Sequence, residues 1–326
     1  MTLPRRKFLH LASAAAALPA ISRLASAQAY PSRPVRILVG LAAGGGTDVA
    51  ARTMAEWLSQ QFREQFIVEN RVGMAGNLAN QAAANAAPDG YTLLFTGPNA
   101  TISASLYKKL PYNLLQDLVA IGSMMRFPNV MVVPSSLPIK TVQEFIDHAK
   151  ANPGRLSLAS SGVGASPHLS GELFKFMTKI EMVHVPYRGS SAAYPDLISG
   201  KVHVLFDNLG GPVLELIRGG QLRALGVTTA RRWDPFPEIP TIAETVPGYE
   251  VIIWYGLFAP RNTPREIVSA LNGRINAGLS DPKVIARIVE GGGVPMPMPI
   301  SEFSEFVKND VEKWRKVIEF AGISAD

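Results

Sequence analysis

Residues 35–48 read VRILVGLAAGGGTD, a short apolar run that continues through three consecutive glycines into a polar pair. Residues 35–41 predict a strand, because the run is short, rich in branched side chains and bounded by glycine. The next residues predict a helix that begins near Thr47 or Asp48 and carries on one face Ala50, Met54, Phe62 and either Trp57 or Leu58. A strand, a turn and a helix in this order form the basic unit of a parallel α/β sheet.

The same alternation of strand and helix continues along the rest of the chain. Further strands are predicted at residues 66–69, 92–96, near 130–133, and at 156–160, 182–186, 202–206, 223–228 and 252–259. Helices are predicted near 167–178 and 191–199, and a capping box from Thr141 to Glu144 begins another that ends at Pro153-Gly154. A long amphipathic helix closes the chain, with an apolar face formed by Phe303, Phe306, Val307, Val311, Trp314, Val317 and Ile318.

These units predict an α/β fold with two lobes. The chain passes from one series of strands and helices to another and returns without a flexible linker, so strands are expected to join the lobes. We expect residues 28–127 and 229–326 to form lobe 1 and residues 128–228 to form lobe 2. Each lobe is expected to be a mostly parallel sheet flanked by helices, with hinge strands between the two.

The first 27 residues predict a signal peptide for export. Arg5-Arg6-Lys7-Phe8-Leu9 matches a twin-arginine pattern, and an apolar run from Phe8 to Ile21 follows it. Ala25-Ser26-Ala27 offers a cleavage site, with Ala27-Gln28-Ala29 as a second option. The apolar run is too short for a membrane helix, so we expect the mature protein in the periplasm, exported by the twin-arginine route and not inserted into the membrane.

Composition narrows the range of functions. Four basic residues and no acid lie within residues 1–27, so removing them lowers the net charge from +6 to about +2. That small charge, with no basic run longer than a pair after the leader, gives no indication of nucleic-acid binding. The chain has no cysteine, which excludes disulfides, thiolate metal ligands, a cysteine nucleophile and a lipid-modified amino-terminal cysteine.

The glycine-rich turn at Gly44, Gly45, Gly46, Thr47 and Asp48 is the first candidate binding site. Glycines let the backbone approach a ligand closely, and the free N–H groups of the following helical turn attract an anion. The segment matches neither common nucleotide motif, because a Walker loop needs Lys where Thr47 stands and the glycine spacing does not fit a dinucleotide fingerprint. A cradle for a carboxylate fits better, and a tight turn without any ligand is the structural alternative.

A second segment of the same design follows the predicted strand 156–160. It contains small and hydroxyl-bearing residues without a fixed charge, namely Ser161, Gly162, Gly164, Ala165 and Ser166. Ser166 before Pro167 is typical of a helix start. Two such cradles in two α/β units could hold the two ends of a small diacid between them.

Other polar residues near strand ends are weaker candidates. Tyr187 offers an apolar face and a hydroxyl, and Arg188 could pair with a carboxylate or simply be a solvated surface residue. Asp207 lies at the end of a predicted strand and could contribute to the site or cap the turn that follows. Trp254-Tyr255-Gly256 fits hinge packing better than ligand contact.

The motifs support neither a serine nucleophile nor a zinc site. Neither Ser161 nor Ser166 lies in the G-x-S-x-G pattern of a nucleophile elbow. His168, His184 and His203 have none of the spacings typical of a zinc site. We therefore expect no catalytic residue, no metal and no cofactor.

Taken together, the motifs resemble those of the periplasmic receptors of tripartite tricarboxylate transporters, often called Bug proteins. The resemblance covers essentially the whole mature chain. It is carried by YPSRPVR at 30–36, the glycine turn through Asp48, VENR at 68–71, PDGYTLL at 88–94, SGVG at 161–164 with His168, HVPY at 184–187, FDN at 206–208, WYG at 254–256 and the closing helix with Trp314.

The resemblance implies a periplasmic binding protein fold of type II that closes on a small organic acid and delivers it to the membrane subunits of a transporter. Carried onto this chain, the ligand residues would be Gly44 to Asp48, Ser161 to Ser166, Tyr187 with Gly189, and Asp207 from the second lobe. The chain has Gly40-Leu41-Ala42-Ala43 where the family commonly has a bulkier pair, which could admit a larger or more apolar ligand. A ligand-sensing receptor for signalling and an exported α/β hydrolase are the alternatives.

Overall fold

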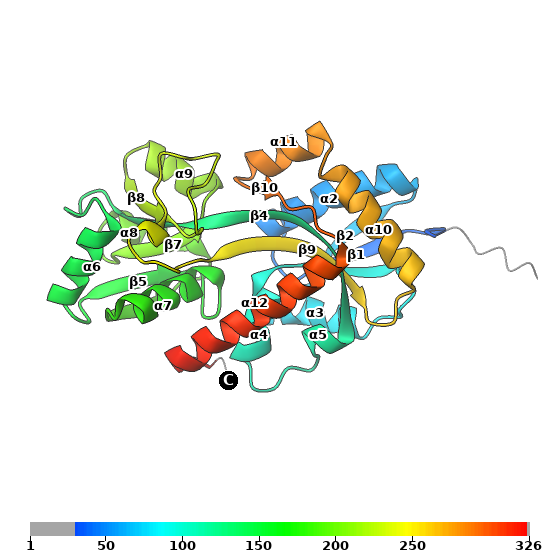
Figure 1. Ribbon diagram of the computed structural model, residues 1–326, viewed down its shortest axis with the longest axis horizontal. Coiled ribbons are helices and arrows are strands. Elements are labelled where there is room, and N and C mark those ends of the chain that lie inside the picture. Colours follow the sequence, from blue (N-terminus) through cyan, green and yellow to red (C-terminus); the bar gives the residue numbers. More distant parts are fainter. Residues whose placement is uncertain (1–29, 325–326) are drawn as a thin grey trace, which may run out of the picture.

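The computed structural model describes residues 30–324, and the predicted signal peptide lies outside them. Ten strands form one curled sheet that runs through two lobes, with helices on its faces (Figure 1). The strands of lobe 1 are β1 (Val35–Val39), β2 (Phe66–Asn70), β3 (Thr92–Thr96), β9 (Ile252–Pro260), the short β10 (Val294–Pro295) and the first part of β4 (Leu118–Pro134). Lobe 2 contains the rest of β4 together with β5 (Leu156–Ser160), β6 (Met182–Pro186), β7 (Val204–Asn208) and β8 (Leu222–Val227).

The two lobes repeat one strand order. Lobe 1 has the order β2-β1-β3-β9-β4, and lobe 2 has the order β6-β5-β7-β4-β8. In each lobe the three outer strands are parallel, as predicted, whereas the strands that cross between lobes run antiparallel to them. Because the order is shared, the glycine turns after β1 and β5 occupy equivalent places, at the carboxyl ends of the first strand in each lobe.

Helices cover both faces of the sheet. Lobe 1 carries α2 (Gly46–Phe62), α3 (Asn77–Ala84), α4 (Pro98–Leu106), α5 (Leu114–Asp117), α10 (Arg265–Gly278), α11 (Pro282–Glu290) and α12 (Ile300–Ala321), with the short helix η1 (Met74–Gly76) before α3. Lobe 2 carries α6 (Val142–Ala151), α7 (Ser166–Thr178), α8 (Tyr194–Ile198) and α9 (Gly211–Arg218), with the short helices η2 (Ser190–Ala192) and, after β8, η3 (Ile242–Glu244). Half of the predicted capping box of α6 is present, since Thr141 accepts a hydrogen bond from the Glu144 N–H, whereas the Glu144 carboxylate accepts from the Lys140 N–H and not from Thr141.

Two extended segments cross between the lobes. β4 pairs with β9 up to Pro128 and with β7 and β8 beyond it, so one continuous strand belongs to both lobes. The return crossing lies beside it, where the fully buried Thr228 accepts from the Asn129 N–H at 2.8 Å and donates to the Val251 carbonyl at 2.7 Å. These bonds tie the two crossing segments together, so a hinge motion would bend them as a pair.

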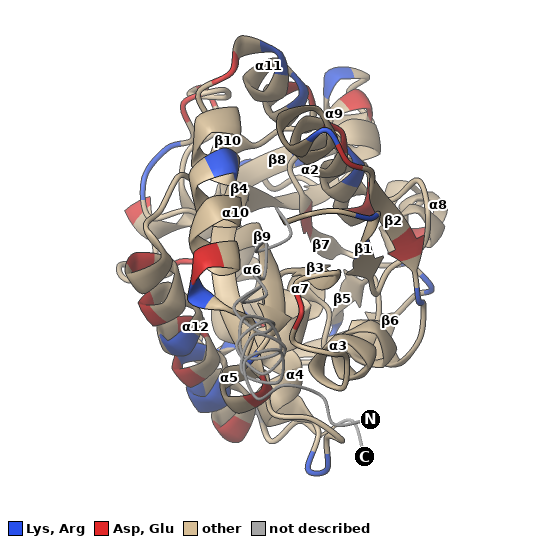
Figure 2. Ribbon diagram, turned by 90° about the vertical axis from the view of Figure 1, so that its right-hand side faces the viewer, with Lys and Arg blue, Asp and Glu red and all other residues tan. Residues whose placement is uncertain are grey.

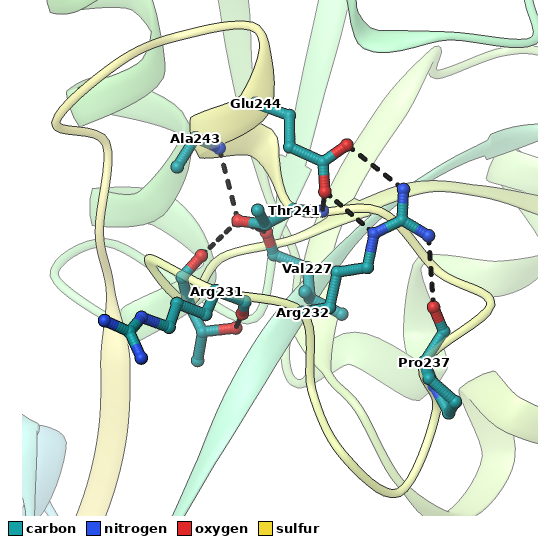
Figure 3. Close-up of polar contacts among 8 residues, drawn as sticks. Val227, Arg231, Arg232, Pro237, Thr241, Ala243 and Glu244 are labelled. Carbon is teal, nitrogen blue, oxygen red and sulfur yellow. Dashed lines mark hydrogen bonds and ion pairs between the residues drawn. The ribbon is translucent and has the colours of Figure 1, made fainter.

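The loop between β8 and β9 is ordered by its own polar contacts. Thr241 caps η3 in a complete capping box, and Arg232 pairs with Glu244 at 2.8 Å (Figure 3). Farther along, the Tyr249 hydroxyl donates to the Ser170 carbonyl of α7 at 2.9 Å. This loop therefore contacts lobe 2, while the lobe division at residues 127/128 and 228/229 stays a prediction.

Helix α12 extends across both lobes (Figure 1) and contacts α4, β4 and α7. Its predicted apolar face is buried at Phe303, Val307, Trp314, Val317 and Ile318. The outward face alternates acidic and basic side chains (Figure 2), among them Arg315 paired with Glu312 and Glu319. Within residues 30–324, no helix has both the length and the apolarity needed to cross a membrane.

Candidate ligand-binding cleft

A cavity of about 450 Å³ lies between the lobes, at the carboxyl ends of their parallel strands. Ligands of open α/β sheets bind at this edge. Lobe 1 contributes Gly40, Leu41, Gly46, Thr47, Ala75, Gly76, Phe95, Thr96, Gly97, Pro98, Asn99, Ile253 and Tyr255. Lobe 2 contributes Ser161, Gly162, Val163, Ala165, Ser166, Pro167, Gly189, Ser190, Asp207 and Asn208.

Helices α2, α4 and α7 begin at this cavity without a side-chain cap, and so does α3, whose N-cap residue Gly76 lines the wall. The residues that precede α2, α4 and α7 are Gly45, Gly97 and Ala165, and none of them provides a capping hydrogen bond. Away from the cavity, α6 and α11 are capped by Thr141 and Asp281, whereas α8, α10 and α12 also begin without a side-chain cap. An uncapped helix start leaves backbone N–H groups free and carries partial positive charge, which favours a bound anion.

The cavity wall presents neutral donors and no cation. Within the described chain, Asp207 is the one charged residue that lines it. Ser161 and Ser166 line it as well, and their hydroxyls form no hydrogen bond to other described residues. An anion in this cavity would therefore be held by backbone N–H groups and hydroxyls.

The first glycine turn is held in shape by Asp48. Its buried carboxylate accepts hydrogen bonds from the Gly44 N–H, Arg52 Nε and Asn70 Nδ2, each at 2.9 Å. Burial acts to raise the pKa of Asp48, but the hydrogen bonds from Arg52, Gly44 and Asn70 outweigh it, so the pKa falls to about 2. Beside it, Thr47 hydrogen-bonds with the hydroxyl of Tyr255, a residue of the crossing strand β9.

The second glycine turn is held by two stacked histidines. His184 Nε2 lies 2.6 Å from Ser160 Oγ, and His168 Nδ1 accepts from the Gly164 N–H at 3.2 Å. The two rings stack with centroids 3.8 Å apart. Burial, with smaller contributions from nearby positive charge, lowers the pKa of His168 to about 3 and that of His184 to about 4, so both are neutral.

Asp207 reaches the cavity from the end of β7. Its carboxylate accepts from Ser190 Oγ at 2.7 Å, from the Tyr194 hydroxyl at 2.6 Å and from the Asn208 N–H at 2.9 Å. Burial raises its pKa, and these hydrogen bonds offset only part of that effect. Tyr187, by contrast, donates its hydroxyl to Asp196 at 2.9 Å.

The structure thus sorts the predicted site residues into three groups. One group lines the cavity and consists of Gly46, Thr47, Ser161, Gly162, Ala165, Ser166, Gly189 and Asp207. Gly44 and Gly45 line an adjoining cavity. Asp48, Gly164 and Tyr187 line neither; Gly164 instead packs against Leu106 of α4, where a side chain would collide. That any of these residues contacts a ligand stays a prediction.

Sequence reasoning missed the start of α4 and the side chain of Tyr255. Thr96, the last residue of β3, lines the cavity together with Gly97, Pro98 and Asn99, which follow it. A signal for them was present, because a Gly-Pro pair directly after the predicted strand 92–96 is typical of a helix start. Tyr255 was expected to serve in hinge packing, yet it also lines the cavity.

The Ser160–His184 contact does not form a nucleophile at the cleft. Ser160 is completely buried and is absent from the cavity wall. Its hydroxyl already interacts with the backbone of Gly162. A general base and a nucleophile need access to the reacting atom, and this pair lacks that access.

The fold and the cleft define a two-lobed α/β solute-binding protein. A family model described as tripartite tricarboxylate transporter family receptor matches residues 50–323. The chain is 34% identical over 300 residues to protein BugT of Bordetella pertussis. The aligned region covers 91% of this chain and 92% of that protein. The chain therefore belongs to the tripartite tricarboxylate transporter receptor family, as the motifs predicted, and this is a family of substrate-binding receptors and not of enzymes.

Solved structures agree with this assignment. R. palustris Rpa4515 with adipate is similar with a TM-score of 0.81 and 37% sequence identity, covering 90% of this chain and 99% of that chain. MatC from Rhodopseudomonas palustris with bound malate is similar with a TM-score of 0.78 and 28% identity, covering 89% of this chain and all of that chain (100%).

Proposed function

We propose that this protein is a periplasmic receptor that binds a small organic carboxylate between its lobes and delivers it to the membrane subunits of a tripartite transporter. The observation that carries the proposal is the meeting of uncapped helix starts, those of α2, α3, α4 and α7, at one cavity without a cation. Such a site matches a carboxylate, because each of its oxygens can accept several N–H donors.

The similar structures support the choice of ligand class. One contains adipate and another contains malate, and both are small acids with two carboxylates. The two glycine turns of this chain lie on opposite lobes of the same cavity. We therefore infer that each turn binds one end of the ligand or that both surround one carboxylate.

Binding is proposed to close the two lobes about the paired crossing segments at Asn129 and Thr228. Hinge closure around a ligand is the usual motion of periplasmic binding proteins. Closure would remove water from the carboxylate and so strengthen its hydrogen bonds to the helix starts. The family assignment supports both the periplasmic location and the transporter as partner.

A calorimetric titration of the purified mature protein with adipate, malate and other small carboxylates tests the proposal. We expect at least one acid to bind with one-to-one stoichiometry and to be recovered unchanged. The matching uncharged amides should not bind, because they lack the negative charge. Turnover of a bound acid, or indifference to every carboxylate, would contradict the proposal. Delivery is tested by uptake into proteoliposomes that contain the membrane subunits, with and without the receptor.

A further inference from the structure

A second cavity of about 530 Å³ adjoins the first. The two share wall residues from both lobes, among them Gly46, Asp207 and Tyr255. The second cavity extends from these shared residues toward the helices α9 and α11, which lie on the same side of β4 (Figure 1). Each volume lies within the range of about 300–1,000 Å³ that is usual for small-molecule sites, so the cleft offers more room than a short diacid needs.

The walls of the second cavity combine large apolar side chains with more charged residues than line the first. Large apolar side chains line the second cavity, namely Val49, Met124, Met125, Phe127 and Ile288. Its charged residues are Asp207, Glu290 and Arg287, and Arg287 already pairs with Glu56 at 2.5 Å. A second carboxylate would meet Glu290 there, which does not line the first cavity, and an arginine that is already paired with Glu56. The part of the wall formed by the apolar side chains therefore suits an uncharged, apolar group.

We propose that the two cavities form one extended site for a carboxylate with a long apolar body. The acid group lies at the helix starts in the first cavity, and the uncharged body passes Tyr255 into the second. This inference rests on the proposed function and adds the ligand class. The residues shared by the two cavities would then contact the middle of the ligand. A ligand that fills both cavities contacts both lobes along its whole length.

The prediction is a dependence of affinity on ligand length. Burying one methylene group is worth about a fourfold gain in affinity. In a series of straight-chain monocarboxylates from butanoate to decanoate, we expect the dissociation constant to fall by about this factor per methylene until the second cavity is full. Calorimetry on the purified mature protein measures the series, with adipate as a short reference acid.

A pair of matched variants locates the effect. Val49→Trp fills the second cavity from an exposed position on α2, where the native side chain is 55% exposed, so folding tolerates the change. We expect this variant to lose most of the gain per methylene. Val289→Trp is the control, because Val289 is an exposed valine on α11, 46% exposed, that does not line the cavity. The control should keep the affinities of the unchanged protein for all acids, and melting temperatures confirm that both variants fold.

The outcomes separate this inference from the proposed function. Binding of short acids without any gain along the series would overturn the extended site and leave the carboxylate receptor intact. Binding of no carboxylate at all would overturn both. An equal length dependence in Val49→Trp and Val289→Trp would place the ligand body outside the second cavity and so refute the inference.

Discussion

At the scale of single residues, Asp48 acts on the cleft without lining it. Its carboxylate fixes Gly44, whose φ of 79° is a left-handed conformation, and connects the glycine turn to Arg52 and Asn70. A buried carboxylate with three donors stabilises the folded state more than an amide in its place would. Hydrogen bonds to charged groups contribute about 1.5–3 kcal/mol each. This residue therefore links the stability of the protein to the shape of the site.

We predict that Asp48→Asn lowers the free energy of unfolding by about 2 kcal/mol, measured by urea denaturation, and weakens ligand binding. The loss should be present at neutral pH and shrink as the pH falls from 3.8 toward 2, because the pKa of Asp48 is lowered to about 2 and its stabilising effect is lost through that range. Glu215→Gln is the control, since Glu215 pairs with Arg218 only at the surface. An equal loss of stability and affinity in Asp48→Asn and Glu215→Gln would contradict the role of Asp48 in holding the glycine turn.

Ser161 provides the test of a neutral donor. We predict that Ser161→Ala reduces the affinity for the best carboxylate by about fivefold, the worth of one neutral hydrogen bond of about 1 kcal/mol. Ser304→Ala, on the exposed side of α12, should leave the affinity unchanged. Unaltered binding in Ser161→Ala would remove this hydroxyl from the ligand contacts.

The stacked histidines predict an acid-sensitive fold. The pKa values of His168 and His184 lie at about 3 and 4, below the ordinary 6.5, so the folded state prefers both rings neutral. The unfolded chain takes up protons first, so stability falls as the pH drops from about 6.5 toward 4. The slope is at most about 1.4 kcal/mol per pH unit for each histidine.

A comparison of variants isolates this effect from other titrating groups. Glu172 and Lys175 lie close to the histidines, and Asp207 has a raised pKa that acts in the opposite direction. We predict that His184→Gln, which can still bond Ser160, flattens the decline of unfolding free energy between pH 6.5 and 4.5. The exposed His148→Gln should leave the decline as it is, and a common slope in both variants would show that the stacked pair does not cause it.

At the scale of elements, α12 packs against both lobes. Trp314 is fully buried in its centre, and the ring of Phe320 near its end lies 3.7 Å from that of Phe176 on α7. We predict that Trp314→Ala costs about 3–5 kcal/mol of unfolding free energy, as expected for a large buried aromatic. Phe320→Ala should cost much less, because Phe320 is 54% exposed. Chemical denaturation measures both variants. If Trp314→Ala and Phe320→Ala lose similar amounts of unfolding free energy, α12 does not anchor the fold through Trp314.

The sequence was sufficient to predict those elements whose hydrophobic periodicity agrees with the burial of their side chains in the fold. The strand and glycine turn at residues 35–48 and the apolar face of α12 lie where periodicity predicted them. The length of β4 could not be predicted, because Pro128 interrupts the strand pattern and only the crossing between lobes explains a strand that continues through it. The Gly97-Pro98 pair signalled the start of α4, but residue type does not show that the backbone donors of this helix start face a cavity.

At the scale of the whole molecule, the division into lobes depends on long-range contacts. Residues 229–251 were predicted to belong to lobe 1, as part of the segment 229–326. Tyr249 instead bonds Ser170, and Val227 bridges to Thr241, both contacts with lobe 2. We therefore propose that lobe 2 extends to about residue 251. A loop of this length carries no local signal for the lobe on which it packs.

Closure of the lobes can be measured directly because the natural chain has no cysteine. Cysteines introduced in place of Glu215 on α9 and Lys283 on α11 would each carry one spin label. The two labels then lie on opposite lobes at exposed sites. We predict that a bound carboxylate shortens the distance between the labels, as measured by pulsed electron spin resonance. A second pair at Glu215 and Lys140, both in lobe 2, should show no change; a distance that ignores the ligand in the first pair would contradict hinge closure.

The uncapped helix starts have one more consequence, for the way such receptors diversify. Main-chain amides are present whatever the side chain, so few single substitutions can erase the attraction for an acid group. The surrounding walls, such as Leu41 and Val49, are free to change in size. Gene copies can thus acquire new cargo by small steps while the shared capacity to hold an acid is inherited intact.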